Sequence, residues 1–329
     1  MKHIFIINPA AGKKNATATV KKMVEDYFSA HPEQGEYEIL VTGAPGDATK
    51  FARKYAESGE ELCFYSCGGD GTTVEVFNGI LGHENCVLTS LPMGSGNDFI
   101  KAFGLDSAAA FLDLSDLVPG VVQKIDHLKT NGVASLNITT AGFDAAVCVA
   151  VNRYRRLPLM AGKGSYILAV ADRFFHSLKN RYAFEVDGEP VSEDDYIFAV
   201  AANGRFYGGS FHPAPFADIT DGYLDFITIP VVSRPQFLKI VGSYGKGTHF
   251  EEAPKKIHLD LTFRRAKKVR ILAPEPIPVN IDGEVTMMEN PTIEIVPGGV
   301  KFKLPCSVWE KYVSRRALLE EEGSKYQAK

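Results

Sequence analysis

The sequence has no long run of apolar residues. Nowhere in its 329 residues do 18 uncharged apolar residues follow one another, which argues against a membrane-spanning helix. The apolar start of the chain ends after five residues, at Asn8-Pro9, and is too short for the core of a signal peptide. We therefore expect a cytoplasmic protein without a transmembrane segment.

Cysteine and positive charge are also scarce. The five cysteines are scattered, and the closest pair, Cys63 and Cys67, has no second pair or histidine at zinc-site spacing. This pattern is typical of buried thiols in a reducing compartment rather than a metal site. Lys and Arg number 36 against 40 Asp and Glu, and the net charge of −4 argues against a nucleic-acid-binding protein. A hydrophobic content of 45% indicates a globular protein, and the length suggests about two domains.

The patterning changes near residue 126. Residues 1–126 alternate between strand-like and helix-periodic segments, which predicts a parallel sheet covered by helices, an α/β domain. Residues 127–306 consist mostly of short β-like runs, among them 255–263, separated by Gly, Pro and Asp-Gly, and predict an antiparallel β-sandwich or barrel. A helical insertion is expected near 152–179. The tail, 307–329, is helix-like and is a candidate for completing the first domain.

The segment CGGDGTTVEVFNG, residues 67–79, places an acid inside a glycine turn. Its glycines are Gly68, Gly69 and Gly71. Thr72 and Glu75 fit a capping box, and the free N–H groups of a helix N-terminus favour phosphate. Asp70 repels phosphate unless a cation lies between them, and Mg²⁺ is the usual one. The turn therefore favours a metal–nucleotide, with a self-bonded structural turn as the alternative.

Two further turns have the same character. Residues 8–14 and 92–99 each follow a strand-like run and supply glycines with hydroxyl, amide or charged side chains. Ligands of open α/β sheets lie beyond the carboxyl ends of the strands, so all three turns are expected to meet. Neither standard nucleotide fingerprint is present: the G-x-x-x-x-G-K-[ST] pattern fails around Gly12, and G-x-G-x-x-G fails at Phe99.

The motifs, taken in order, resemble the diacylglycerol kinase catalytic-domain family of lipid kinases in its bacterial form. They run INPAAG, VTGAPGDA, CGGDGTTVEVFNG, LPMGSGNDF, KID, NITTAGFDA, ANGRFYGG, PFADITDGYLD and NIDGE. GGDGT alone is weak evidence because NAD kinases share it, but the ordered set closing with Asp-Gly-Glu is specific. Ser95 stands where the family more often has threonine, and the hydroxyl is kept.

The resemblance implies Mg²⁺-dependent transfer of the γ-phosphoryl group of ATP to a lipid hydroxyl. It also implies an NAD kinase-like nucleotide-binding domain, a β-sandwich domain, and a nucleotide in the cleft between them. The implied nucleotide-side residues are Asn8, Gly12, Thr42, Gly68, Gly69, Asp70, Gly71, Thr72, Glu75, Ser95, Asn97 and Glu284. The resemblance implies catalytic roles for Asp70 and for Asp282, the latter as general base. It implies a catalytic Mg²⁺ network of Asp70, Asp98 and Asp126. It also implies a structural metal site at Asp218, Asp221 and Tyr223. Asp282 and Asp221 both lie in hairpin-turn patterns, which is the structural alternative for each.

Other functions stay open at this stage. A kinase for a soluble acceptor such as NAD shares the glycine turn, and a non-catalytic nucleotide- or lipid-binding regulator would share the fold. The lipid could be diacylglycerol, phosphatidylglycerol, a sphingoid base or a polyprenol. A homodimer is also an open alternative. We expect transient contact with the membrane surface, as phospholipid biosynthesis would require. The first candidate for this membrane contact is the Arg-rich segment 153–160, with a solvated helix face as the alternative. The second candidate is the set of aromatic residues within 206–216.

Overall fold

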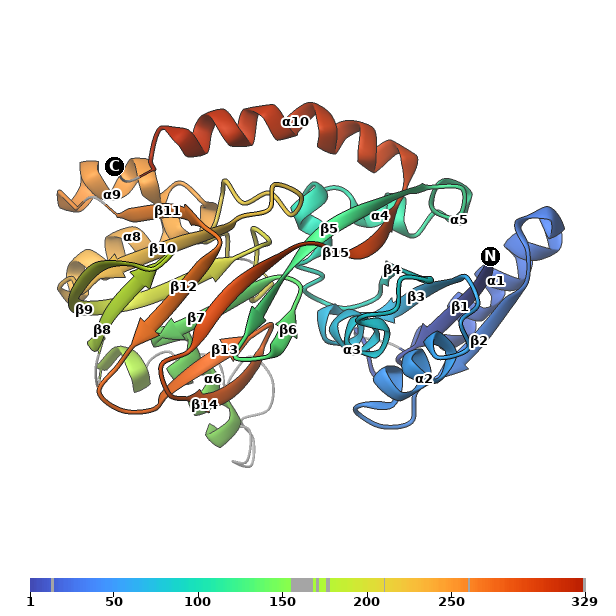
Figure 1. Cartoon of the computed structure of the whole chain (residues 1–329), viewed down its shortest axis with the longest axis horizontal. Coiled ribbons are helices and arrows are strands. Elements are labelled where there is room, and N and C mark those ends of the chain that lie inside the picture. The colour runs from blue at the N-terminus through green and yellow to red at the C-terminus, as the bar shows by residue number, and fades with distance from the viewer. Residues whose placement is uncertain are drawn as a thin grey trace. The chain divides into compact units, whose positions relative to one another are not determined.

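The chain folds into two compact units. The structure, a computed structural model, describes residues 1–12, 15–154, 168–169, 172–175, 178–209, 211–259 and 261–327, except the side chains of residues 152, 153 and 192. Unit 1 comprises Met1–His127 and Pro297–Leu318, and unit 2 comprises Leu128–Val296 and Leu319–Lys329. The predicted α/β domain followed by an antiparallel β domain is confirmed (Figure 1).

Unit 1 is built on a parallel sheet. Its strands are β1 (Lys2–Ile7), β2 (Tyr37–Val41), β3 (Leu62–Gly68) and β4 (Cys86–Pro92), in the order β2-β1-β3-β4. Beyond β4, residue Phe302 of β15 (Thr292–Leu304) pairs in parallel with Leu88. Every residue of β3 and β4 is buried, as expected for a parallel sheet covered on both faces.

The helices of unit 1 pack their small or apolar faces inward. They are α1 (Thr17–Ala30), α2 (Asp47–Ala56), α3 (Asp70–Ile80), α4 (Ala108–Phe111), α5 (Leu114–Leu117) and the first part of α10 (Cys306–Ser324), with 3-10 turns at Pro32–Gln34 and Ile100–Phe103. Helix α2 buries only alanines, and a Cβ on Gly79 of α3 would lie 2.6 Å from the Cβ of Ala52. These small residues let α2 and α3 approach closely.

Unit 2 is an antiparallel sheet with helices. Its strands are β5 (Val121–Thr130), which begins in unit 1, β6 (Val133–Ser135), β7 (Ile138–Gly142), β8 (Asn180–Val186), β9 (Glu189–Ala202), β10 (Leu224–Pro230), β11 (Thr262–Ala266), β12 (Lys268–Leu272), β13 (Ile277–Ile281), β14 (Glu284–Met288) and the start of β15. Strand order is β14-β13-β7-β9-β8-β12-β15, and β10 pairs with β9 and β11. Its helices are α6 (Phe143–Tyr154), α8 (Arg234–Lys246) and α9 (His249–Ile257).

Two apolar clusters form the core of unit 2. Along β9, Ala199 and Ala201 enter one cluster, while Val200 and Ala202 enter the other. Because successive side chains of a strand point to opposite faces, both faces of this sheet are buried. The cluster that contains Val200 also contains aromatic residues of α6 and α8, and we call it the aromatic cluster.

The structure corrects several expectations. The strand predicted at 255–263 is wrong: α9 ends at Ile257 and β11 begins at Thr262. Helix α8 was also missed in the β-rich half, although Ser233 and Gln236 form a capping box at its start. The insertion near 152–179 and the segment 153–160 lie largely outside the described residues. Among those described, no helix is both long and apolar enough to cross a membrane.

Candidate functional site

The three glycine turns of unit 1 meet at the carboxyl ends of β1, β3 and β4. A Cβ on Gly12, whose φ is +75°, would overlap the carbonyl oxygen of Met93. A Cβ on Gly94 would lie 2.5 Å from the Cα of Gly69, and the Met93 N–H donates to the Gly68 carbonyl at 2.7 Å. Only glycine permits these backbone contacts, so the sequence builds one continuous cradle from three distant segments.

Hydrogen bonds fix the cradle to the first strand. The Asn8 N–H donates to the Cys67 carbonyl at 3.0 Å, and the Asn8 side-chain amide donates to the Thr72 hydroxyl at 3.0 Å. The predicted capping box is wrong: the N-cap of α3 is Gly69, three residues before the predicted Thr72, and Thr72 lies inside the helix. Glu75 instead accepts from the Gly46 N–H at 3.1 Å, which attaches the turn before α2 to α3.

Asp70 is the acid of this cradle. Its Oδ1 accepts from the Phe99 N–H at 3.0 Å, across the turn that follows β4. Burial raises the pKa of Asp70, and the charge of Asp98 adds to the rise. Asp98 itself forms an ion pair with Lys101 at 2.7 Å, a partner that the sequence analysis did not single out. A nearby cation would stabilise the charged form of a carboxylate that is buried beside another acid.

The cradle suits a Mg²⁺-bound nucleotide better than a metal alone. Among the residues that the structure describes, no group of three or more His, Cys, Asp or Glu side chains could hold a metal ion. Asp126, the third predicted member, is buried and accepts from the Gly298 N–H at 2.7 Å. Mg²⁺ usually takes one or two carboxylates and completes its shell with water and phosphate oxygens, so Asp70 beside an open helix N-terminus fits that chemistry.

The remaining predicted nucleotide-side residues of unit 1 differ in exposure. Ser95 is exposed at the tip of its turn, whereas Thr42 is buried and its N–H donates to the Ile7 carbonyl at 2.9 Å. Asn97 adopts a left-handed conformation, with φ +50°, and its side chain bonds the backbone of Gly94 in both directions. Asn97 therefore shapes the glycine turn, a role that asparagine tolerates well.

Asp282, in unit 2, is tied to the backbone. Its carboxylate accepts from the N–H groups of three successive residues at 2.7–3.3 Å, namely Leu136, Asn137 and Ile138. Its own backbone is left-handed, with φ +47°. Hydrogen bonds from several N–H groups to one charged carboxylate are strong and fix its position. Asp282 thus clamps the β13–β14 turn onto the start of β7.

Glu284 stands at the other end of the same turn. It is the first residue of β14, pairs with Ile281 of β13, and is exposed. The clamp formed by Asp282 fixes the backbone on which Glu284 sits. Of the two carboxylates in Asp-Gly-Glu, Glu284 is the one whose side chain is open to solvent.

The predicted structural metal loop holds a cluster of acids around an arginine. Asp218 accepts from the Thr220 N–H and hydroxyl, and Asp221 accepts from the Tyr223 N–H. Arg265 lies 4.0 Å from Asp221 and 3.5 Å from Asp225. The cluster therefore has more carboxylates than cations, although its acids do not converge as a ready-made metal site in the described structure.

Asp225 is a buried acid of this cluster that the sequence analysis did not single out. Burial raises its pKa to about 8, Arg265 opposes that rise, and the charges of Asp221 and Asp218 add to it. The sequence signal for Asp225 is its position four residues after Asp221. Tyr223 differs from the acids, since its exposed ring packs against the Lys267 ammonium.

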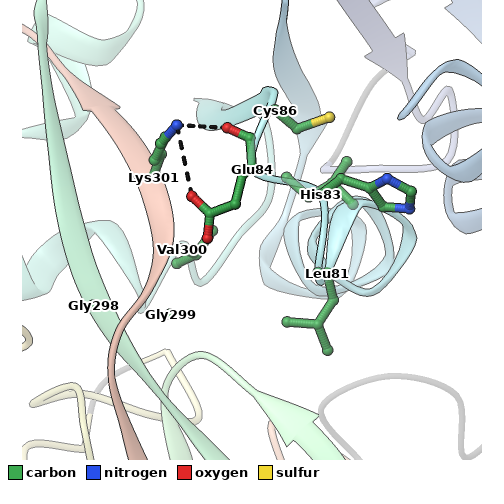
Figure 2. Close-up of a pocket in the computed structure, with 10 residues that line it drawn as sticks. Leu81, His83, Glu84, Cys86, Gly298, Gly299, Val300 and Lys301 are labelled. Atoms are coloured by element: carbon green, nitrogen blue, oxygen red, sulfur yellow. Dashed lines mark hydrogen bonds and ion pairs between the residues drawn. The ribbon is translucent and has the colours of Figure 1, made fainter. Parts of the chain in front are cut away.

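A small pocket of unit 1 is unrelated to the glycine cradle. It has a volume of about 40 Å³ and is lined by the segment after α3 and by residues 298–301 (Figure 2). The Lys301 ammonium spans it to reach the Glu84 carbonyl and carboxylate. Cys86 begins β4, so the pocket lies at the amino end of that strand, whereas the cradle lies at its carboxyl end.

The aromatic residues considered for membrane contact are mainly packed inside. Phe206 and Phe216 are buried, and Phe206 stacks on His212. Tyr207 and Phe211 pack against the aromatic cluster. These four aromatic residues therefore contribute to the packing of unit 2.

Comparison with known proteins covers nearly the whole chain. Residues 2–130 match the model of the diacylglycerol kinase catalytic domain, and residues 137–303 match the YegS C-terminal NAD kinase beta sandwich-like domain. A diacylglycerol kinase of Bacillus subtilis is 25% identical over 85% of this chain and 88% of its own. A Pseudomonas aeruginosa protein named "Probable lipid kinase YegS-like" is 29% identical over 89% and 92%.

A solved structure agrees on the fold. A crystal structure described as a diacylglycerol kinase from Bacillus anthracis superposes with a TM-score of 0.68 at 23% identity, covering 93% of this chain and 98% of that one. Both family models match in the order that the motifs predicted, and the second spans half of the chain. The chain therefore belongs to the diacylglycerol kinase catalytic-domain family, with the YegS-type β-sandwich as its second domain.

Proposed function

We propose that this protein is a lipid kinase that uses Mg²⁺ and transfers the γ-phosphoryl group of ATP to a lipid hydroxyl at the membrane surface. The observation that carries the proposal is the cradle in which three glycine turns surround one partly buried acid, Asp70. Phosphoryl transfer needs positioning and charge neutralisation more than covalent chemistry, and a rigid cradle of N–H groups supplies positioning.

The residues of the cradle have distinct tasks in this proposal. The backbone of the turns around Gly12, Gly69 and Gly94 binds the phosphates of ATP, and Asn8 and Asn97 hold those turns in place. Asp70, together with Asp98 and Asp126, would hold Mg²⁺. Bound Mg²⁺ would neutralise charge that develops on the transferring phosphoryl group.

We assign proton acceptance from the attacking hydroxyl to Glu284 and the clamping of its turn to Asp282. The family resemblance gives the base role to Asp282, but both of its carboxylate oxygens accept from backbone N–H groups and hold the turn. Glu284 is exposed and follows directly on the clamped turn. A general base must reach the hydroxyl it deprotonates, which an exposed side chain allows.

The proposal of a lipid acceptor is supported by the family and by the named relatives. The alternative, a soluble acceptor such as NAD, makes a different prediction for the product. Incubation with γ-labelled ATP, Mg²⁺ and mixed micelles of diacylglycerol, phosphatidylglycerol, a sphingoid base or a polyprenol should transfer label to at least one lipid. Label in NADP, or only in inorganic phosphate, would overturn the proposal.

A further inference from the structure

The first turn of α3 is attached to the sheet of unit 1 by hydroxyl groups. Ser66 on β3, Thr73 on α3 and Ser90 on β4 are each at most 3% exposed. Ser66 and Ser90 pair with each other in the parallel register of the two strands. The Thr73 hydroxyl lies 2.8 Å from that of Ser66 and 3.4 Å from that of Ser90, so both serines face α3. We call these three side chains the hydroxyl triad.

The hydrogen bonds of the triad have a direction. The Ser66 hydroxyl donates to the Thr89 carbonyl at 3.1 Å, which leaves its oxygen to accept from Thr73. The oxygen of Thr73 can then accept from Ser90. Apolar contacts tolerate small shifts of a helix, whereas a connected set of buried hydrogen bonds favours one arrangement. The triad therefore specifies where the start of α3 lies against the sheet.

The rest of α3 is attached differently. Beyond its first turn, the buried side chains Val76, Phe77 and Ile80 are apolar, as is usual where a helix covers a parallel sheet. Hydroxyl groups at such a contact cost free energy unless they are hydrogen-bonded, and they add little from apolar burial. Their place at the end of the helix that joins the glycine cradle favours a role in the cradle over a role in the core.

Thr73 connects the triad with Gly69, the N-cap of α3. The Thr73 N–H donates to the Gly69 carbonyl at 3.1 Å, and the Thr73 hydroxyl lies 3.4 Å from the same oxygen. On the sheet, Ser66 precedes Gly68 by two residues, roughly 7 Å along β3. Asp70 directly follows Gly69 and begins the helix. A tilt of this turn would therefore move the Asp70 carboxylate and the open N–H groups of the helix start together.

We propose that Thr73 is a positioning residue for the phosphates of the nucleotide. Its hydroxyl, held by Ser66 and Ser90, fixes the first turn of α3 in the orientation in which the N–H groups of the cradle bind phosphate. The inference rests on the proposed function and adds a residue that sets the geometry of the cradle from the sheet side. Thr73 itself touches neither ATP nor Mg²⁺ in this proposal, and it acts through Gly69 and Asp70.

Two substitutions separate the hydroxyl of Thr73 from its volume. Thr73→Val keeps the volume and removes the hydroxyl, while Thr73→Ser keeps the hydroxyl and removes a buried methyl group. Both should lower the melting temperature by about 2 to 4 °C. We expect the Kd for MgATP, measured by titration calorimetry, to rise about tenfold in Thr73→Val, as for one lost hydrogen bond to a charged group. Thr73→Ser should keep the wild-type Kd.

Thr89→Val is the matched control. Thr89 precedes Ser90 on β4, is fully buried, and points to the opposite face of the sheet, where its hydroxyl donates to the Lys303 carbonyl at 2.7 Å. This variant loses one buried hydrogen bond, as Thr73→Val does, but not one beside the cradle. We expect the same fall in melting temperature and an unchanged Kd for MgATP. The KM for dioctanoylglycerol should stay at the wild-type value in all three variants.

Ser66→Ala tests the same connection from the sheet and serves if Thr73→Val does not fold. It removes the 2.8 Å partner of Thr73 and should raise the Kd for MgATP about threefold or more. In the double variant the two effects on Kd should be less than multiplicative, because both substitutions break the same contact. An unchanged Kd in Ser66→Ala, or fully multiplicative effects, would overturn the inference.

The outcomes separate the two proposals. If wild type binds MgATP and phosphorylates a lipid but Thr73→Val keeps the wild-type Kd, the inference is overturned and the proposed function stands. The inference is also overturned if Thr89→Val weakens MgATP binding as much as Thr73→Val does, because the effect is then one of stability alone. If wild type binds no MgATP, the proposed function fails and the inference fails with it.

Discussion

The two units differ in how some of their buried polar groups are held. In unit 1, Ser66, Thr73 and Ser90 form a chain of hydroxyl contacts at 2.8–3.4 Å between β3, α3 and β4. The His3 ring donates from Nε2 to the Gln34 carbonyl at 3.1 Å and accepts at Nδ1 from the Tyr65 hydroxyl at 2.9 Å. In unit 2, Asp144 is buried beside the Thr140 hydroxyl, and burial raises the pKa of that carboxyl to about 6.

The difference teaches what each unit does in the proposed reaction. A satisfied polar network is rigid and suits a cradle that binds the same phosphates in every cycle. A buried acid with a raised pKa lowers the stability of the protein at neutral pH. We therefore connect the satisfied polar network of unit 1 with a preformed nucleotide site, and the buried acid of unit 2 with the pH dependence of stability.

The largest expected effect would come from unit 1. Asp70→Asn should lower kcat/KM at least about a hundredfold, because charge stabilisation in the transition state is lost. The melting temperature should stay the same or rise. Burial disfavours the charged form of Asp70 and so raises its pKa, and asparagine carries no charge. Steady-state kinetics and thermal melting of the same preparation give both numbers. Turnover like that of wild type would refute the metal–nucleotide role of this turn.

Two carboxylates of unit 2 should separate stability from chemistry. Glu284→Gln should lower kcat by about 10²- to 10⁴-fold and leave the melting temperature unchanged, as removal of a general base does. Asp282→Ala should cost about 3 kcal/mol or more of unfolding free energy, because three N–H groups lose a charged acceptor. Urea unfolding and kcat are the measurements. A stable but inactive Asp282→Ala beside an active Glu284→Gln would return the base role to Asp282.

A fall in pH should destabilise unit 1 through His3 and stabilise unit 2 through Asp144. Burial, with the charge of Lys303, lowers the pKa of His3 to about 4, so its contribution is intact above pH 6.5 and is lost as pH falls towards 4. Between pH 7 and 5 the loss is about 2 kcal/mol. The raised pKa of Asp144, about 6, makes folding easier as pH falls below 6.

The variants make that contrast measurable. In urea unfolding at pH 7 and 5, His3→Gln should lose less stability on acidification than wild type, and Asp144→Asn should lose about 1 kcal/mol more. His249, buried in unit 2 with its pKa lowered to about 4, adds a loss of the same sign as His3 to all three proteins. Equal pH dependence in His3→Gln and wild type would show that His3 is not buried as a neutral ring.

The smallest expected effect concerns the acidic loop of unit 2. A cation that binds only the folded state raises the melting temperature by mass action, and Mg²⁺ in place of EDTA should raise it by a few degrees. The shift should be small because Arg265 already compensates Asp221 and Asp225. Asp221→Ala should abolish it, while Asp195→Ala, which removes a surface ion pair with Lys179, should keep it. An equal shift in wild type and Asp221→Ala would place the cation elsewhere.

The sequence predicted the parts of the site that depend on backbone. Glycines with an acid between strand and helix have few other uses, so the cradle around Asp70 was visible in the pattern. It missed what depends on tertiary contacts. The partner of Glu75 lies 29 residues away at Gly46, and the partners of Asp282 lie 144 to 146 residues away. Asp144 stands in one of the quoted motifs, but its burial and raised pKa follow from the packed protein and could not be predicted.

One measurement tests the lipid kinase account most directly. Purified protein is incubated with γ-labelled ATP, Mg²⁺ and an equimolar mixture of dioctanoylglycerol micelles and NAD, with Asp70→Asn as the blank, and the organic and aqueous phases are separated. The account predicts label in a phosphorylated lipid in the organic phase, at one phosphate per lipid, and none above the blank in NADP. Label in NADP with an empty organic phase would contradict it.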